Sequence, residues 1–278
     1  MYVCVNMCFL ADTNYNFNFY NIMNYLKKLE GKLALVTGAD QGIGLQIAID
    51  LLESGCDVIA HYFTSDDQAS QLIALAKNVG RKAWIVQADL TKEDEVISLV
   101  KKTRNLYDRL DILVNNTGGL IARHKLVEID EEFWNKVMEI NLNTTMMVTR
   151  EFLPLLANAG SSSVINLASL AGRKGGHPGS LAYSTAKGAV ITFTRSLSSE
   201  IAEKGIRVNC VAPGLILGTA FHEKHSTPES IEATIKQIPL HRAGTPHDIS
   251  RAVLFLASEY DGFITGVTMD INGGIYCA

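Results

Sequence analysis

The sequence predicts an α/β fold in which helices cover both faces of one parallel sheet. From Lys32 onward, short apolar runs alternate with amphipathic helical stretches along the chain. The apolar runs are continuous rather than alternating in polarity, which is typical of parallel strands buried on both faces. No composition shift or linker interrupts this alternation, so we expect a single domain.

The expected elements follow one another in a regular order. Strands are predicted at residues 32–38, 57–63, 82–90, 110–116, 162–169, 206–214 and 266–273. Helices are predicted at 44–55, 66–80, 92–107, 130–156 and 180–197. The irregular stretch from Pro213 to Thr227 is the longest candidate loop. Loops at the carboxyl edge of a parallel sheet usually hold the substrate.

Composition excludes several classes of protein. The 278 residues are 47% hydrophobic, enough for a sizeable core. A net charge of -4 leaves no electrostatic footprint for nucleic acid or an anionic membrane. No apolar run reaches the ~20 residues that a bilayer requires. Five scattered cysteines without a CxxC pair argue against disulfides and zinc, so we expect a cytoplasmic protein.

The first 22 residues differ from the rest. They are rich in Asn and aromatic residues, and they lack the basic start and small-residue cleavage site of a signal peptide. Met23 begins a more natural start. We expect residues 1–22 to be a disordered extension or an upstream start-codon artefact, and residues 23–278 to form the folded domain.

The segment "TGADQGIG" forms a glycine-rich turn between the first strand and the first helix. Such a turn lets the backbone approach a pyrophosphate at the helix N-terminus. The predicted nucleotide contacts in it are Gly38, Gln41, Gly42, Ile43 and Gly44. Its spacing differs from the usual G-x-G-x-x-G, so a turn without a ligand is the alternative.

The end of the second strand is expected to meet the adenosine ribose, and it offers His61, Tyr62, Thr64 and Ser65. No acidic residue stands there to oppose a 2′-phosphate, although no Arg clamps one either. Thr64 and Ser65 could donate to it, so we expect NADP(H) to be preferred over NAD(H). Alternatively, the acids that follow at residues 66 and 67 only cap the next helix.

Tyr183 and Lys187 are four residues apart and share one helix face. A nearby ammonium lowers the pKa of a phenol and prepares it for proton transfer to a carbonyl oxygen. Small neighbours, Ser184, Ala186 and Gly188, would let a cofactor ribose approach. Taken by itself, the pair could equally be a solvated surface pair.

Further polar or small residues stand where other strands end. They are Asp89 on the third strand, Asn115 and Gly118 on the fourth, Ser169 on the fifth, and Pro213 with Gly214 on the sixth. Asn141 lies within the long predicted helix. Because Asn is unfavourable there, we expect a local break in the helix that serves the site.

Together these motifs resemble the short-chain dehydrogenase/reductase family from about Leu29 to Cys277. The resemblance rests on "TGADQGIG", "NNTG", Asn141, Ser169, "YSTAK" and "PG" in this order. Thr117 departs from the family, which usually has Ala at this position. The resemblance implies a single-domain Rossmann-type fold with a doubly wound, seven-stranded parallel sheet. It also implies a homotetramer, and an NAD(P)-dependent oxidoreductase acting on CH–OH groups by direct hydride transfer without a metal.

The resemblance assigns catalytic roles. Tyr183 would be the general acid in reduction, Lys187 would hold the nicotinamide ribose and lower the tyrosine pKa, and Ser169 would polarise the carbonyl. Asn141 would hold a water behind Lys187.

It also assigns nucleotide contacts. Asp89, with Leu90 beside it, would contact the adenine, and Asn115 with Gly118 would flank the adenosine ribose. The backbone at Pro213 and Gly214 would face the nicotinamide.

Two basic clusters, "ARHK" and "GRKGGH", flank the expected nicotinamide site. Arg123, Arg173 and His177 from these clusters suggest a small anionic carbonyl substrate; a solvated rim is the alternative. The pair His222 and His225 lacks the spacing of a metal site, so we expect no metal.

The loops are also similar to the branch that reduces 4-deoxy-L-erythro-5-hexoseulose uronate to 2-keto-3-deoxy-gluconate in alginate breakdown. Neighbouring branches, 3-oxoacyl-carrier-protein reductases and glucose dehydrogenases, stay open. So does a nucleotide-binding regulator without turnover.

Overall fold

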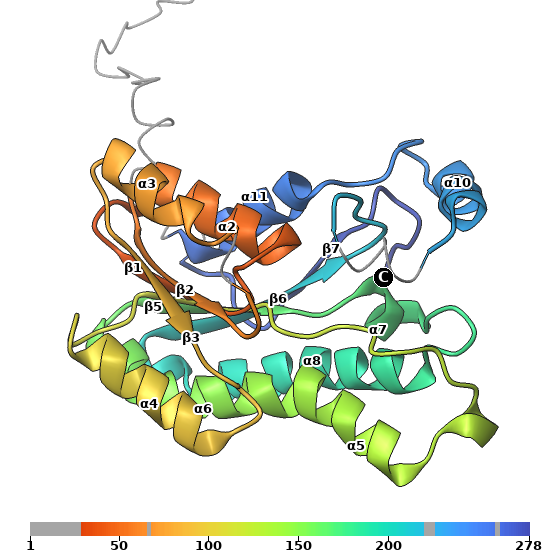
Figure 1. Cartoon of the computed structure of the whole chain (residues 1–278), viewed down its shortest axis with the longest axis horizontal. Helices are drawn as coiled ribbons and strands as arrows, with labels where there is room; N and C mark the ends of the chain where they lie inside the picture. Colours follow the sequence, from red (N-terminus) through yellow and green to blue (C-terminus); the bar gives the residue numbers. More distant parts are fainter. Residues whose placement is uncertain (1–28, 66–67, 220–225, 259–261) are drawn as a thin grey trace, which may run out of the picture.

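A seven-stranded parallel sheet forms the centre of the molecule (Figure 1). The computed structural model describes residues 29–65, 68–219, 226–258 and 262–278. The strand order is β3-β2-β1-β4-β5-β6-β7, with every neighbouring pair parallel. The order reverses direction at β1, as in doubly wound Rossmann-type sheets. The predicted fold class is confirmed.

The elements alternate along the chain much as predicted. The strands are β1 (Leu33–Val36), β2 (Asp57–Tyr62), β3 (Ala83–Gln87), β4 (Ile112–Asn115), β5 (Ser162–Leu167), β6 (Ile206–Pro213) and β7 (Thr268–Ile271). The helices are α2 (Gly42–Glu53), α3 (Gln71–Asn78), α4 (Glu93–Arg104), α5 (Glu131–Met138), α6 (Thr144–Asn158), α7 (Leu170–Lys174), α8 (Leu181–Glu200), α10 (Pro228–Gln237) and α11 (Pro246–Ala257).

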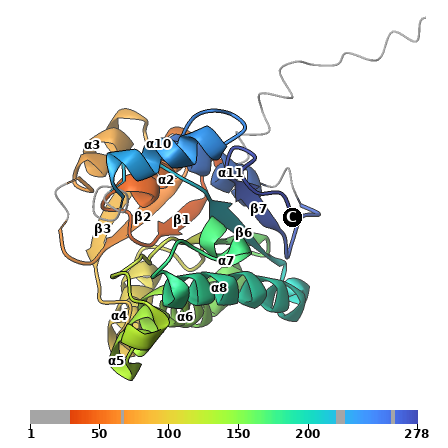
Figure 2. The same ribbon diagram turned by 90° about the vertical axis from the view of Figure 1, so that its right-hand side faces the viewer.

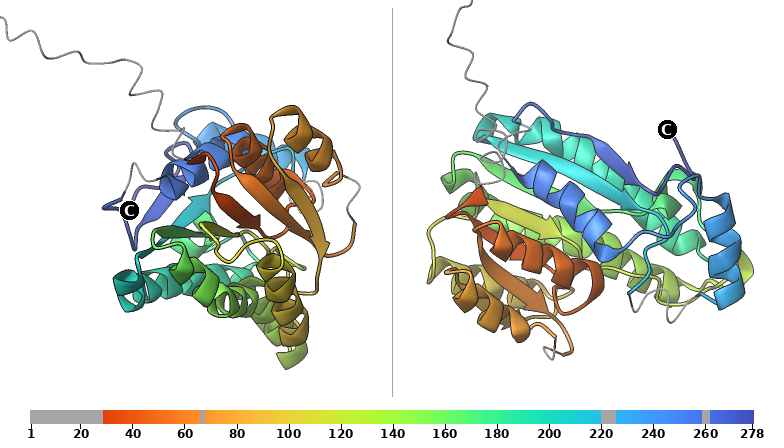
Figure 3. Two further views of the ribbon diagram at one scale, coloured as in Figure 1. Left: turned by 90° about the vertical axis from the view of Figure 1, so that its left-hand side faces the viewer. Right: turned by 90° about the horizontal axis from the view of Figure 1, so that it is seen from above.

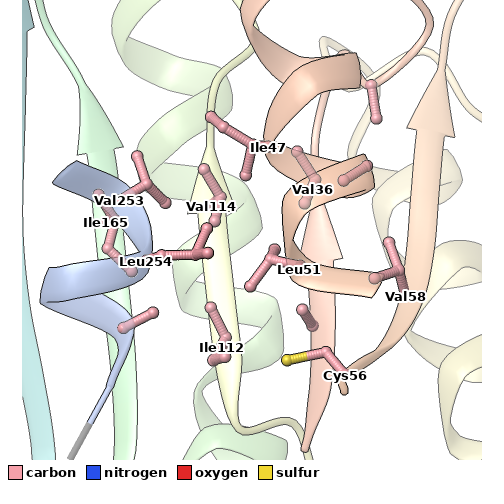
Figure 4. Close-up of a cluster of buried hydrophobic side chains, with 14 of the residues drawn as sticks. Val36, Ile47, Leu51, Cys56, Val58, Ile112, Val114, Ile165, Val253 and Leu254 are labelled. Carbon is pink, nitrogen blue, oxygen red and sulfur yellow. The ribbon is translucent and has the colours of Figure 1, made fainter. Parts of the chain in front are cut away.

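Helices cover both faces of the sheet, and each face has its own apolar core. Helices α2, α3 and α11 lie on one face, and α4, α6 and α8 lie on the other (Figure 1). On the first face, Val114 and Ile165 of the sheet pack with Leu51 and Val253 from the helices (Figure 4). On the second face, Phe152 is fully buried. Burial on both faces explains why the strands read as continuous apolar runs.

A buried carboxylate joins α2 to α11, which lie side by side over the sheet (Figure 3). Asp50 of α2 accepts hydrogen bonds from Gln46 at 2.8 Å and from Ser250 of α11, and it pairs with His247 at 2.9 Å. These partners satisfy a charge that would otherwise be costly to bury. The cluster fixes α2, whose N-terminus borders the functional cleft.

The structure differs from the predicted elements in two places. The helix expected at 130–156 is divided into α5 and α6 by a π-helical turn, Glu139–Asn143, which contains Asn141. The helix is irregular at Asn141 as expected, although the chain stays helical through the π turn. Three helices were not predicted, α7, α10 and α11. The last two begin with Thr-Pro and a capping box, a signal that would have located both.

All strands end at one edge of the sheet because they run parallel. Figure 2 looks onto this side of the molecule, with α10 above and α7 and α8 below. The loops that follow β1, β2, β4, β5 and β6 therefore meet there. In doubly wound sheets this edge is where ligands bind.

Candidate active site

A cleft of about 1110 Å³ follows the carboxyl edge of the sheet. One end is formed by the turn between β1 and α2 and by the residues that follow β2. The other end is formed by α7, the start of α8, the segment after β6, and α10. We call these the turn end and the tyrosine end.

At the turn end, the glycines permit a backbone path that a side chain would obstruct. Gly38 and Gly42 have left-handed φ angles of 60° and 54°. A Cβ on Gly44 would lie 2.0 Å from the carbonyl oxygen of Gly38. Gln41 makes no side-chain cap with the first turn of α2, so backbone N–H groups there remain for an anion. This geometry fits a pyrophosphate.

His61 holds this turn in place from β2. Its side chain is 1% exposed, and its Nδ1 accepts a hydrogen bond from the N–H of Gly38 at 3.1 Å. Its Nε2 therefore carries the proton and donates to the carbonyl of Ala88 at 2.9 Å. Burial lowers the pKa of His61, which favours this neutral form. His61 also lines the cleft.

Other residues predicted at the turn end differ in position. Thr64 lines the cleft, whereas Tyr62 and Ser65 do not. Asp89 faces the start of α4, where it accepts a hydrogen bond from the Thr91 hydroxyl at 2.7 Å and pairs with Lys92 at 3.4 Å.

Leu90 is 4% exposed and belongs to the apolar core. Neither Asp89 nor Leu90 lines the cleft, and their contact with the adenine stays a prediction.

The end of β4 divides into a core residue and cleft residues. The side chain of Asn115 is buried and donates to Thr149 at 2.9 Å and to Asn166 at 2.8 Å, so it does not line the cleft. Asn116 lines the cleft and donates to the carbonyl of Gly38 at 2.9 Å. Gly118 also lines it.

At the tyrosine end, Tyr183 and Ser169 face each other. Both line the cleft, and their hydroxyls are hydrogen-bonded. Burial raises the pKa of Tyr183, and the bond to Ser169 lowers it by a smaller amount. That Lys187 lowers this pKa stays a prediction. Lys187 is itself buried, and burial lowers its pKa to about 8.

Lys187 and Asn141 meet at Gly118. Lys187 Nζ donates to the carbonyl of Leu167 at 2.8 Å. Asn141, fully buried in the π-helical turn, is held by both backbone groups of Gly119, at 2.9 and 3.0 Å. A Cβ on Gly118 would lie 2.7 Å from Asn141 Oδ1 and 2.9 Å from Lys187 Nζ. A glycine is thus required where these two side chains converge. The π-helical turn that carries Asn141 supports a functional role, since such turns often occur at functional sites.

The small residues beside Tyr183 pack helices together. Ser184, Ala186 and Gly188 do not line the cleft. Ala186 is fully buried in an apolar cluster. A Cβ on Gly188 would lie 3.4 Å from the carbonyl of Gly172 in α7, so small residues keep α7 and α8 close. These residues therefore do not border the cleft themselves.

The two basic clusters are joined in space, but they do not contribute equally. His124 forms a bridge with Ser180, and Arg123 Nη1 donates to the carbonyl of Pro178 at 3.4 Å. Arg123, Lys174 and His177 line the cleft and are exposed. Arg123 and Lys174 place positive charge around the tyrosine end, with His177 beside them.

Arg173 does not face the cleft, contrary to expectation. Its Nε and Nη2 donate to the carboxylate of Asp270 on β7 at 3.1 and 3.0 Å. Its guanidinium also lies 5.6 Å from the ring centroid of Tyr276. Because the Nε–Nη2 edge of the guanidinium already holds Asp270 and Arg173 does not line the cleft, we do not retain Arg173 as a substrate ligand.

Helix α10 supplies a cleft face that the sequence analysis did not identify. The residues are Thr227, Ser230, Ile231, Thr234 and Gln237, which recur at helical spacing. Pro213 and Gly214 also line the cleft, together with Leu215, Ile216 and Thr219. The expected loop from Pro213 to Thr227 thus borders the site through its described residues. Asp40 and Phe63 were also not singled out.

Two further findings concern metals and membranes. Within the described ranges, no group of three or more His, Cys, Asp or Glu side chains could hold a metal ion. His222 and His225 lie outside the described residues, as does the expected extension at 1–22. No described helix combines the length and apolarity needed to cross a membrane.

Comparison with known sequences places the chain in a large group of enzymes. The family profile described as "Enoyl-(Acyl carrier protein) reductase" matches residues 38–276. The chain is 36% identical over 245 residues to a 3-oxoacyl-[acyl-carrier-protein] reductase of Staphylococcus epidermidis, covering 88% of this chain and 99% of the relative. It is 37% identical over 246 residues to nodulation protein G of Azospirillum brasilense, covering 88% and 98%.

Solved structures agree with this grouping. An NADH-dependent reductase, A1-R′, described as responsible for alginate metabolism, matches with a TM-score of 0.82 at 31% identity. A mutant of the DEH reductase A1-R′ matches with a TM-score of 0.83 at 32% identity. In both cases 91% of this chain and 100% of the other are covered. The chain belongs to the short-chain dehydrogenase/reductase family and is an NAD(P)-dependent oxidoreductase acting on CH–OH or carbonyl groups.

Proposed function

We propose that this protein reduces the carbonyl group of a small anionic sugar acid, with 4-deoxy-L-erythro-5-hexoseulose uronate as the best candidate and 2-keto-3-deoxy-gluconate as its product. The observation that carries the proposal is the tyrosine end of the cleft. There the hydrogen-bonded pair Tyr183 and Ser169 lies inside a rim formed by Arg123, Lys174 and His177.

The chemistry follows from the positions of these side chains. A reduced nicotinamide supplies the hydride. Ser169 and Tyr183 donate hydrogen bonds to the substrate oxygen, and Tyr183 gives its proton to that oxygen as it becomes an alcohol. The raised pKa of Tyr183 keeps the phenol protonated at neutral pH, as a general acid must be. We infer that Lys187 and Asn141, which both converge on Gly118, return a proton to the tyrosine through water.

The rest of the lining supports a polar substrate. Among the described residues at the tyrosine end, no acidic side chain lines the cleft, so nothing there opposes a carboxylate. Arg123 is the side chain best suited to bind one. The face of α10 offers hydroxyl and amide groups from Thr227, Ser230, Thr234 and Gln237 to a substrate with several hydroxyl groups.

Reduction of a 3-oxoacyl thioester is the second candidate. Two observations favour it: the similarity to 3-oxoacyl-[acyl-carrier-protein] reductases and the apolar residues Ile121, Leu215, Ile231 and Ile275 in the same cleft.

The coenzyme preference is the finer part of the proposal. At the end of β2, Thr64 offers a hydroxyl to the cleft and the strand itself carries no carboxylate there, so this strand end, taken alone, favours NADP(H). Comparing kcat/KM for NADPH and NADH with one carbonyl substrate tests it. The expected homotetramer and the cytoplasmic location stay predictions. Light scattering on the purified protein would test the first.

The test of function follows the loss of reduced nicotinamide. The deoxy-hexoseulose uronate and an acetoacetyl thioester are offered separately, each with NADPH and with NADH. We expect rapid consumption with the uronate. Rapid consumption with the thioester alone would instead assign acyl-chain reduction and make the basic rim a solvated surface. If neither substrate caused loss of reduced nicotinamide, both candidates would be contradicted.

A further inference from the structure

Asp40 is the single acidic side chain among the described residues that line the cleft. It lies at the turn end, between Gly38 and Gly42, where the backbone fits a pyrophosphate. The side chain is half-buried, and burial raises its pKa while its own backbone N–H lowers it by a smaller amount. Among the described residues that line the cleft, no Lys or Arg lies at this end to compensate the charge of the carboxylate.

The structure places Asp40 beside the end of β2. The N–H of Ala39, the preceding residue, donates to the carbonyl of His61 at 2.8 Å, and the N–H of Gly38 donates to the His61 ring at 3.1 Å. In dinucleotide-binding folds the adenosine ribose lies between the turn and this strand end, and an acid on the strand usually accepts from its 2′-hydroxyl. Here β2 has no such acid, and the turn itself supplies a carboxylate.

The basic side chains of the cleft lie elsewhere. Arg123, Lys174, His177 and Lys187 all belong to the tyrosine end. At the turn end the described lining residues include only one further ionisable side chain, His61, whose Nδ1 accepts from Gly38 and whose pKa is lowered by burial, so the ring is neutral. A 2′-phosphate at this end would therefore meet a carboxylate and no described cation.

We propose that Asp40 is a coenzyme-selecting residue: its carboxylate accepts a hydrogen bond from the 2′-hydroxyl of NAD(H) and repels the 2′-phosphate of NADP(H). This inference rests on the proposed nicotinamide-dependent function. It opposes the preference expected from the end of β2 alone, because a charge in the turn outweighs the hydroxyl of Thr64. The acid that selects the coenzyme thus lies in the turn between β1 and α2 and not at the end of β2.

Equilibrium binding tests this inference without turnover. Isothermal titration calorimetry would measure the Kd of NAD⁺ and of NADP⁺, which differ only in the 2′-phosphate, on the full chain. The variant Asp40→Asn removes the charge and keeps the shape. We expect it to tighten NADP⁺ about tenfold, because a phosphate monoester carries nearly two charges close to the carboxylate. NAD⁺ should bind equally well or up to about threefold more weakly, through loss of a charge-assisted hydrogen bond.

Two further variants keep the test decisive. Asp40→Ser, in which the hydroxyl is uncharged, should change the ratio of the two Kd values in the same direction if Asp40→Asn folds poorly. Asp108→Asn removes the same charge from an exposed position before β4, at the opposite edge of the sheet, and should leave the ratio unchanged.

An unchanged ratio in both Asp40 variants, or an equal change in Asp108→Asn, would overturn the inference while leaving the enzyme a reductase. If the wild-type protein bound neither nucleotide, the proposed function itself would fail.

Discussion

The two ends of the cleft are built by different means. The turn end is formed mainly by the backbone. Glycines permit the tight turn, and the side chains of His61 and Asn116 hold it by hydrogen bonds to backbone atoms of Gly38. At the tyrosine end, buried side chains form the site. Tyr183, Lys187 and Asn141 are at most 9% exposed, and each is enclosed by packing from α7, α8 or the π-helical turn.

This difference separates binding from chemistry. A backbone cradle suits a nucleotide, whose phosphates need many N–H donors and little else. Proton transfer instead needs one side chain at one position with the right protonation state. Changes at the tyrosine end should therefore reduce turnover, whereas changes at the turn end should reduce nucleotide affinity. The following predictions test that division, beginning with the largest effect.

The largest effect is expected from Tyr183→Phe. This change removes the proton donor and keeps the ring, so kcat should fall on the order of 10³-fold. The Kd of NAD⁺, measured by calorimetry, should stay within about twofold because the turn end is untouched. Appreciable turnover in the variant would show that another group supplies the proton.

The second-largest effect is expected from Gly44→Ala, which should weaken nucleotide binding. The new Cβ would lie 2.0 Å from the Gly38 carbonyl, so the turn must move. Nucleotide Kd should rise on the order of 10²-fold, and overpacking should cost about 1–3 kcal/mol of stability. Gly80→Ala is the control, since Gly80 has a φ of 71° and no atom near its Cβ position. It should lose stability through strain but keep its nucleotide affinity.

The buried ammonium of Lys187 predicts a pH dependence of stability. Its pKa is lowered from 10.5 to about 8, so the unfolded chain binds one more proton than the folded protein between these values. Raising the pH from 8 to 10 should therefore stabilise the protein, by about 2 kcal/mol relative to Lys187→Met. Urea unfolding of both proteins at several pH values measures this. Parallel curves would mean that the ammonium is solvated.

The smallest effect should distinguish two arginines. Arg123→Ala should raise KM for the uronate about tenfold, because a charged hydrogen bond to the carboxylate is lost. KM for a neutral carbonyl compound should change little. Arg173→Ala should instead lower Tm and leave both KM values unchanged, because Arg173 binds Asp270. If Arg123→Ala and Arg173→Ala changed KM equally, Arg123 would not bind the carboxylate directly, and the basic rim would act only through its overall charge.

Much of the site could be located from the chain alone. The glycine turn, Ser169 and the pair Tyr183 and Lys187 all lie beside the cleft as expected. Asn141 was expected to break its helix, and the helix is irregular there. These residues are predictable because each belongs to a short motif whose local geometry is set by its own neighbours.

Other residues were misplaced because long-range contacts decide where their side chains point. Arg173 and Asp270 are 97 residues apart, and nothing local indicates that they pair. Asn115 and Asn116 are adjacent at a strand end, yet one faces the core and the other the cleft. The pleat of the strand makes the alternation certain, but which residue faces the cleft depends on what covers each face.

Sequence by itself therefore determined the fold class, the carboxyl edge as the place of the cleft, and the residues that we propose for catalysis. Periodicity and turn chemistry act over a few residues, so they are legible along the chain. Tertiary structure decided the pKa values of the buried side chains and the partners with which side chains pair. Burial raised the pKa of Tyr183 and lowered that of Lys187. Folding also placed the carboxylate of Asp40 in the cleft beside the end of β2. Desolvation and charge pairing depend on every element packed around a group, and only the folded chain brings those elements together.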